Sequence, residues 1–303
     1  MLAALAVVTA LLWATLGRET PRAEPAELTV LNWNVCGEAG GRRGEPGYCP
    51  LRNRPDRKVA AIRDLATRHD ADVITLQEVC GGAAGSHLAL LEEALGSGWT
   101  VVRARGTRPD GSAECRGGLR GTLGLGIAVR GKVTSSSAVD TLSDGAAAPG
   151  AHVKPLLCVD VEGRPYRVCT THLLPGSDER GRAQAARIAR HASPDGRPYV
   201  LTGDFNRDSA SSQLAPLTGV LDECPALRDR PTHHAWNRNR RTHGFRTLDH
   251  VFAGPRTGGA TAEFLSCGVD ATHMDTTPNE PHSGPAGGLS DHAPVHATIR
   301  FGR

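Results

Sequence analysis

The stretch Val200-Leu201-Thr202-Gly203-Asp204-Phe205-Asn206 joins a strand to a polar turn, and the rest of the chain is organised around it. Strand formers beginning at Tyr199 lead into a glycine and an Asp-x-Asn pair. Because side chains alternate along an extended chain, we expect Asp204 and Asn206 on the same face, just past the strand end. A carboxylate beside a neutral amide suits holding a water molecule next to a phosphate, because the acid accepts the water's proton and the amide adds no repelling charge. An ordinary turn after a strand is the alternative.

Further polar side chains follow other predicted strands in the same way. They are Asn34, Glu78, His172 and the pair Asp291-His292. Each has an ordinary structural interpretation, such as a turn cap, a solvated strand end or a structural histidine. Their recurrence at successive strand ends, together with the Asp204/Asn206 pair, favours one shared site.

The hydrophobic pattern predicts one domain of strands and helices. Helices are predicted at 55–69, 86–95 and 178–191, where apolar residues recur on one helical face. Strands are predicted at 28–35, 72–76, 99–103, 122–129, 133–138, 153–161, 166–171, 199–202, 248–253, 262–266 and 292–301. The chain has no internal repeat and no interior linker, so a single domain over 27–303 is the simplest organisation.

The first residues form an apolar leader. Residues 2–16 are nearly continuous apolar sequence, shorter than the about 20 residues that a spanning helix needs. No Lys or Arg precedes the run and no clear small-x-small cleavage site follows it, so residues 1–26 are interpreted either as a signal peptide or as an N-terminal membrane anchor. We expect the domain to be secreted or, with an anchor, held at the outer face of the cytoplasmic membrane.

The eight cysteines indicate disulfides, because their number is even and no Cys-x-x-Cys metal spacing occurs. One pair follows from geometry, since a hairpin turning at 162–165 sets Cys158 opposite Cys169. The remaining six are expected to pair in sequence order: Cys36, Cys49, Cys80, Cys115, Cys224 and Cys267.

Six short motifs, taken in order, carry a resemblance to a known superfamily. They are Leu31-Asn32-Trp33-Asn34, Leu76-Gln77-Glu78, Thr171-His172-Leu173, Gly203-Asp204-Phe205-Asn206, Leu248-Asp249-His250-Val251-Phe252 and Ser290-Asp291-His292. The set resembles that of the endonuclease/exonuclease/phosphatase superfamily, which includes pancreatic-type deoxyribonucleases, abasic-site endonucleases, bacterial sphingomyelinases and inositol polyphosphate phosphatases. The resemblance, from Leu28 to about Ile299, implies an α/β (α+β) fold: a four-layer sandwich of two stacked mixed, mainly antiparallel sheets flanked by helices.

The resemblance also implies a phosphoesterase that depends on Mg²⁺, for which Mn²⁺ or Ca²⁺ can substitute. Asn34, Glu78 and Asp291 are the expected residues on the metal side, because Mg²⁺ prefers oxygen ligands. A divalent cation suits this chemistry because a phosphate ester needs its negative charge offset.

The same resemblance assigns catalytic roles. His292 is the expected general base, and Asp249 is the carboxylate that sets its tautomer and pKa. Asp204 and Asn206 are expected to orient the attacking water and the phosphate. His172 is expected to donate to a phosphoryl oxygen or to the leaving group. No covalent intermediate is implied.

Composition and charge bear on the substrate. A net charge of +3 argues against a general nucleic-acid coat protein, and an aromatic fraction of 4% argues against base stacking on aromatic platforms. Between Arg228 and Arg246, however, six arginines and three histidines accompany a single acid. We expect a loop here whose Arg238, Arg240 and Arg241 grip a polyanion, with a solvated loop as the alternative.

The substrate expected from the resemblance is DNA, cut without sequence preference by a monomeric secreted endonuclease. Cys36 stands where abasic-site endonucleases carry an acid, and His172 where they carry a tyrosine, so the secreted branches are favoured over DNA repair. No apolar hairpin for membrane docking is evident, as a sphingomyelinase would need. The alternatives are a phospholipid or sphingomyelin phosphodiesterase, a phosphomonoesterase and an inactive binding domain.

Overall fold

The computed structural model describes residues 26–38, 40–143, 150–176, 178–255 and 262–302. The predicted leader lies outside these ranges except for Ala26. None of the helices within them combines the length and the apolar character that crossing a bilayer requires.

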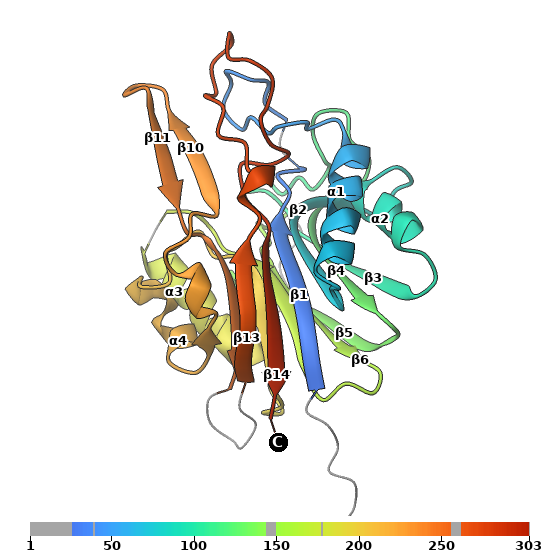
Figure 1. Ribbon diagram of the computed structural model, residues 1–303. Coiled ribbons are helices and arrows are strands. Elements are labelled where there is room, and N and C mark those ends of the chain that lie inside the picture. The colour runs from blue at the N-terminus through green and yellow to red at the C-terminus, as the bar shows by residue number, and fades with distance from the viewer. Residues whose placement is uncertain (1–25, 39, 144–149, 177, 256–261, 303) are drawn as a thin grey trace, which may run out of the picture.

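Two six-stranded sheets form the centre of the molecule (Figure 1). The first sheet has the order β13-β14-β1-β2-β4-β3, with β13 at Ala262–Val269, β14 at Val295–Phe301, β1 at Ala26–Asn34, β2 at Val73–Gly81, β4 at Thr122–Arg130 and β3 at Trp99–Arg105. The second sheet has the order β5-β6-β7-β8-β12-β9, with β5 at Val133–Asp140, β6 at Pro155–Val161, β7 at Arg167–His172, β8 at Tyr199–Asp204, β12 at Asp249–Gly254 and β9 at Asp222–Glu223. A separate hairpin pairs β10, His233–Asn237, with β11, Thr242–Arg246.

Helices cover the outer faces of both sheets, which confirms the predicted four-layer sandwich. They are α1 at Pro55–Arg68, α2 at His87–Leu95, α3 at Asp178–His191 and α4 at Ala215–Thr218, with 3₁₀ turns at Ser212–Leu214, Pro225–Leu227 and Ala271–His273. In Figure 1, α1 and α2 lie on one side of the molecule and α3 and α4 on the other. The predicted stripe of Val59, Ile62 and Leu65 is buried against the first sheet, because these positions share one face of α1.

Alternating apolar side chains hold the two sheets together. Val30 and Ile127 of the first sheet and Val159 and Val200 of the second belong to one buried cluster. Such a cluster stabilises the stacked arrangement because each strand contributes every second residue to it. The remaining residues of the inner strands face the helices, so these strands are buried on both sides.

The strand order brings the polar strand ends to one edge. Each sheet contains one parallel pair, β1 with β2 and β7 with β8, and parallel strands end at the same edge. In register, Asn34 lies beside Gln77 and His172 beside Asp204. The antiparallel partners β14 and β12 begin at this edge, which places Asp249 opposite Asp204. Residues distant in sequence therefore meet above the carboxyl ends of the two parallel pairs.

A buried polar cluster bridges the sheets below this edge. Gln77 Nε2 donates to Asn32 Oδ1 at 2.7 Å and to Thr170 Oγ1 at 2.8 Å, and Thr202 Oγ1 donates to Thr75 Oγ1 at 2.7 Å. The bonds of Gln77 to Thr170 and of Thr202 to Thr75 join strands of opposite sheets, and the bond of Gln77 to Asn32 joins neighbouring strands of the first sheet. Because buried polar groups are costly without partners, the cluster favours one alignment of the two sheets.

Replacing Gln77 by alanine is expected to lower the free energy of unfolding by about 2–4 kcal/mol, because the change removes two buried hydrogen bonds and leaves a cavity. Urea denaturation followed by circular dichroism measures this. Ser137→Ala, at an exposed position of β5, is the control and should change the value by less than about 0.5 kcal/mol. Equal effects of the two substitutions would contradict a structural role for the cluster.

All eight cysteines pair as predicted. Cys158 and Cys169 face each other on β6 and β7, with Cα atoms 4.1 Å apart. The other disulfides follow the sequence order: Cys36–Cys49, Cys80–Cys115 and Cys224–Cys267. Cys36–Cys49 closes the loop that follows β1, which brings that loop next to the polar edge.

Two predicted strand boundaries and one predicted loop were wrong in informative ways. β2 continues to Gly81 rather than ending at Leu76, and a bulge interrupts it between Leu76 and Val79. β14 begins at Val295 rather than at His292, because Pro294 has no N–H to donate to the ladder. The arginine-rich segment, predicted as a loop, contains the hairpin β10–β11, which stands away from the sheets in Figure 1.

Candidate active site

Asn34, the last residue of β1, lies at the centre of the polar edge. Its Nδ2 is 3.0 Å from Asp204 Oδ2, 3.2 Å from Glu78 Oε1 and 3.5 Å from His292 Nε2. Its Oδ1 accepts the backbone N–H of Cys36 at 2.9 Å, which fixes the orientation of the amide. A neutral donor between two carboxylates reduces their repulsion, so Asn34 holds them close together.

His292 is oriented by a buried carboxylate. Its Nδ1 is 2.8 Å from Asp249 Oδ2, and its Nε2 points to Asp204 Oδ2 at 3.6 Å. Although burial works against a charged imidazole, the carboxylates of Asp249 and Asp204 raise the pKa of His292 well above its usual value. The turn before β14 is tied to β1 because Trp33 Nε1 donates to the His292 carbonyl at 2.9 Å and Ser290 Oγ donates to the Asn34 carbonyl at 2.7 Å.

His172 faces the same carboxylate from β7. Its Nε2 is 3.4 Å from Asp204 Oδ2, and burial lowers the pKa of His172 to about 3. The imidazole is therefore neutral at physiological pH and can donate one N–H without carrying a positive charge.

Asn206 is held by the turn that follows β8. Its backbone N–H donates to Asp204 Oδ1 at 2.8 Å, and its Nδ2 donates to the Leu173 carbonyl at 2.9 Å. Its φ is 52°, a left-handed conformation that asparagine tolerates better than most residues. The side-chain alternation of a strand, which was predicted to continue from Asp204 to Asn206, therefore stops in this turn. Both side chains nevertheless lie at the polar edge.

Glu78 reaches the site from the bulge in β2 rather than from a strand end. Its φ is 52°, so the chain turns locally and directs the side chain toward Asn34. Burial, together with the carboxylates of Glu38 and Asp291, raises the pKa of Glu78 to about 8. In the described part of the chain, neither Glu78 nor Asp291 forms an ion pair with Lys or Arg.

This group of carboxylates fits a divalent cation. Glu78 and Asp291 are hard oxygen donors whose charges repel, and a cation between them would relieve that repulsion. Asn34 offers its amide oxygen as a further ligand, since one lone pair remains beside the bond from Cys36. The donor set suits Mg²⁺ better than it suits a softer metal.

Three groups of potential metal ligands occur among the described residues; one, His233, Asp291 and His292, lies in the site itself, and the other two have partners without an ion. Cys36 and Cys49, near Glu78, are already joined in a disulfide. His69 Nε2 bonds to Asp270 at 2.9 Å, and its ring stacks on that of His296 with centroids 3.8 Å apart and an interplanar angle of 20°.

Two residues of the site were missed by sequence reasoning. His233, on β10, lies with its ring centroid 4.6 Å from that of His292 and its Nε2 3.9 Å from Asp291 Oδ2. Lys58, fully buried in α1, donates to the carbonyls of Val35 and Cys36, which follow Asn34. Burial lowers the pKa of Lys58 to about 7. Apolar periodicity gave no signal for either residue.

The predicted substrate-binding arginines lie at the hairpin tip. Arg238 Nε donates to the Asn279 carbonyl at 3.0 Å, and Arg241 pairs with Glu280 at 3.3 Å. The Arg240 backbone N–H donates to the Asn237 side chain, which closes the turn. His233 is at the opposite end of the hairpin, so the structure does not bring these arginines to the catalytic residues.

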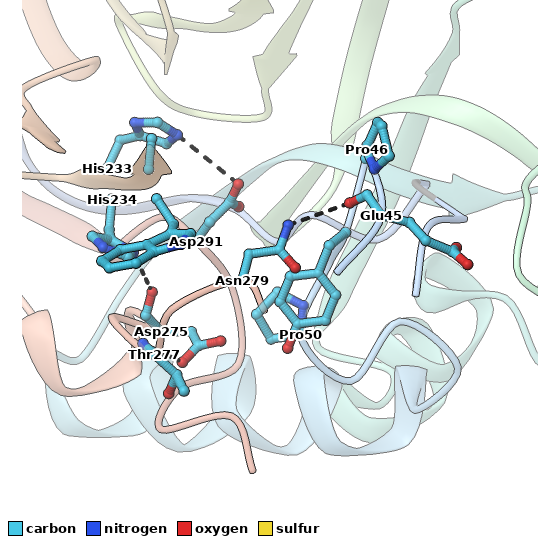
Figure 2. Close-up of a pocket in the computed structure, with 13 residues that line it drawn as sticks. Glu45, Pro46, Pro50, His233, His234, Asp275, Thr277, Asn279 and Asp291 are labelled. Atoms are coloured by element: carbon cyan, nitrogen blue, oxygen red, sulfur yellow. Dashed lines mark hydrogen bonds and ion pairs between the residues drawn. The ribbon is translucent and has the colours of Figure 1, made fainter. Parts of the chain in front are cut away.

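A cavity of about 260 Å³ adjoins the site. Its lining comes from the disulfide-closed loop with Pro50, from β10, from the loop 275–279 and from Asp291. Figure 2 shows Glu45, Pro46 and Pro50 on one side of it and His233 and His234 on the other. The cavity therefore opens beside Asp291, one of the expected metal ligands.

The model of the Endonuclease/Exonuclease/phosphatase family matches residues 31–292, which is most of the chain. The chain belongs to this family. A search of curated protein sequences returned no match.

Solved structures of other family members share the fold. A Bacteroides vulgatus endonuclease/exonuclease/phosphatase protein is 19% identical with a TM-score of 0.62, over 91% of this chain and 100% of that one. A mannosyl-6-phosphatase of Bacteroides thetaiotaomicron is 19% identical with a TM-score of 0.59, over 91% and 100%. TDP2 of D. rerio, solved with a single-strand DNA product, is 14% identical with a TM-score of 0.59, over 90% and 99%. Family membership makes this chain a phosphate-ester hydrolase by fold; it does not select a substrate.

Proposed function

We propose that this protein is an exported, divalent-metal-dependent phosphodiesterase that cleaves nucleic acid, and DNA in particular, by direct attack of water. The observation that carries the proposal is the meeting of Glu78, Asp204 and His292 around the amide of Asn34, each within 3.5 Å of its Nδ2. Carboxylates, a carboxylate-bound imidazole and a neutral donor are the groups that phosphate-ester hydrolysis requires.

His292 is the proposed general base. Its Nδ1 bond to Asp249 leaves Nε2 as the atom that, in the neutral form of the imidazole, takes the proton of the attacking water, and Asp249 stabilises the imidazolium that forms. Asp204 lies on the same side of the ring and accepts a hydrogen bond from that water, while Asn206 fixes the Asp204 carboxylate through its backbone N–H.

His172 is the proposed donor to the phosphate. Because it is neutral, it supplies a hydrogen bond to a phosphoryl oxygen or to the leaving oxygen and not a full positive charge. Glu78, Asp291 and Asn34 are the residues that would hold Mg²⁺, or Mn²⁺ or Ca²⁺ in its place. When bound, the ion supplies positive charge that offsets the phosphate and the carboxylates.

Nucleic acid as the substrate is supported by two observations. The hairpin tip carries Arg238, Arg240 and Arg241, which are exposed and can follow a phosphate backbone beyond the site. A similar structure, D. rerio TDP2, was solved with a single-strand DNA product. We propose a monomer that acts on DNA without reading its sequence.

Export is supported by the four disulfides, which persist in oxidising compartments. We propose that residues 1–26 are the signal peptide, or the anchor to the outer face of the membrane, and that residues 27–303 are the catalytic domain.

Nicking of circular single-stranded DNA and of supercoiled plasmid tests the function. The full protein with its disulfides intact should nick at least one of them with Mg²⁺ and neither with EDTA. His172→Ala should reduce the rate at least about tenfold, whereas His191→Ala, an exposed histidine at the end of α3, should not. Absence of nicking by a folded, metal-binding protein would refute the nuclease and favour a lipid or small-molecule phosphate ester.

A further inference from the structure

We infer that the cavity beside the site is a binding pocket for a single unpaired nucleobase, and that the enzyme acts on single-stranded nucleic acid in preference to duplex. This inference rests on the proposed function. Asp291 belongs both to the cavity lining and to the proposed metal ligands. The base in the cavity would therefore belong to a nucleotide next to the phosphate that is cut.

The size of the cavity limits its occupant. Its volume of about 260 Å³ is below the range of about 300–1,000 Å³ that is usual for pockets of drug-sized ligands. It therefore admits one ring group and not a longer segment of polymer. The closing walls are β10 on one side and the loop held by Cys36–Cys49 on the other.

The charge of the lining excludes a second phosphate. Its charged members are the acids Glu45, Asp275 and Asp291, and neither Lys nor Arg lines the cavity. These acids disfavour a phosphate, whereas the amino and ring N–H donors of a base can bond to a carboxylate such as that of Glu45.

Aromatic residues are rare in the chain but gather at this cavity. The sequence has four tryptophans and three tyrosines, and Trp236 and Tyr48 line the cavity from separate segments. Trp236 Nε1 is already used, since it donates to Glu280 Oε1 at 3.3 Å. Arg43 lies over the Tyr48 ring at 4.6 Å, and the His243 ring meets the indole at 4.9 Å with an interplanar angle of 66°, so the stacking surface inferred for a base is the rest of the Trp236 ring. The sequence-based expectation of no aromatic platform missed this, because composition does not report where the few aromatic residues meet.

The same geometry disfavours a duplex. A base in a double helix is stacked and paired, so it reaches a one-ring pocket only after it leaves the stack, and that step costs free energy. An unpaired base enters without this cost. The phosphates on either side remain outside, where the arginines of the hairpin tip are exposed.

The test compares three substrates of one length with the full protein and Mg²⁺: a single-stranded oligonucleotide, its duplex, and a strand of abasic nucleotides with the same phosphodiester backbone. Wild type should cut the single strand about tenfold faster than either of the others, measured as kcat/KM. Trp236→Ala should lower the ratio of base-bearing to abasic cleavage about tenfold through KM, and Trp236→Phe, which keeps a ring, should restore most of it.

Phe245→Ala is the matched control, because Phe245 is an exposed aromatic residue on the neighbouring strand of the hairpin and does not line the cavity. It should leave the ratio unchanged. Equal cleavage of base-bearing and abasic strands by wild type, or equal ratios in wild type and Trp236→Ala, would overturn the pocket while leaving the nuclease intact. If the Trp236→Ala protein does not fold, the pocket is tested by the cleavage ratio of Trp236→Phe and by the wild-type preference among the three substrates. If no nucleic acid is cut, both proposals fail.

Discussion

Replacing His292 by alanine is expected to lower kcat by about 10²–10⁴-fold, because the change removes the only imidazole whose Nε2 faces Asp204 while its Nδ1 bonds to Asp249 in the described structure. KM should change much less, since the imidazole acts on the water more than on substrate binding. Steady-state hydrolysis of a single-stranded oligonucleotide with saturating Mg²⁺ measures both values.

A second histidine, four residues further along the chain, provides the control. His296 lies within β14 and stacks on His69, away from the catalytic group. His296→Ala should keep kcat within a fewfold of wild type, and circular dichroism should show that both variants are folded. Activity of His292→Ala within a fewfold of wild type would exclude His292 as the general base.

The second large effect concerns the metal. Mg²⁺ at about 100 times its Kd should stabilise the native protein by about 2.7 kcal/mol, which raises the melting temperature by about 5 °C or more. Glu78→Gln should abolish this rise, because an amide cannot replace the charge of the carboxylate. Without metal, the same variant should melt at or above the wild-type temperature, because glutamine removes the cost of a carboxyl group whose burial beside Glu38 and Asp291 raises its pKa to about 8.

A substitution that lowers the melting temperature relative to wild type in Mg²⁺, but leaves it equal or higher in EDTA, identifies a metal ligand. Loss of a purely structural residue would lower it in both conditions. Thermal melting in EDTA and in Mg²⁺ gives both numbers for each variant. Glu93→Gln, at an exposed position of α2, is the control and should behave as wild type in both conditions. A Glu78→Gln protein that is stabilised by Mg²⁺ as much as wild type would remove Glu78 from the metal site.

Local patterns in the sequence determined much of this protein. The apolar stripe of α1, the strand at Tyr199–Thr202 and the Cys158–Cys169 pair each depend on residues close in the chain, so periodicity and hairpin register were sufficient. The motif order also named the polar residues that the structure brings together, such as Asn34 and His292, because each follows or precedes a strand that is recognisable by itself.

Tertiary structure decided the features that depend on contacts between distant segments. Glu78 enters the site only because a bulge redirects β2, and His233 only because the hairpin β10–β11 packs against the turn before β14. The residues of β11 are all exposed, so no apolar alternation marked this hairpin in the sequence. The pocket that places Tyr48 near Trp236 exists only where separate segments meet. Sequence patterns report which face of an element is buried, whereas long-range packing decides which exposed faces meet.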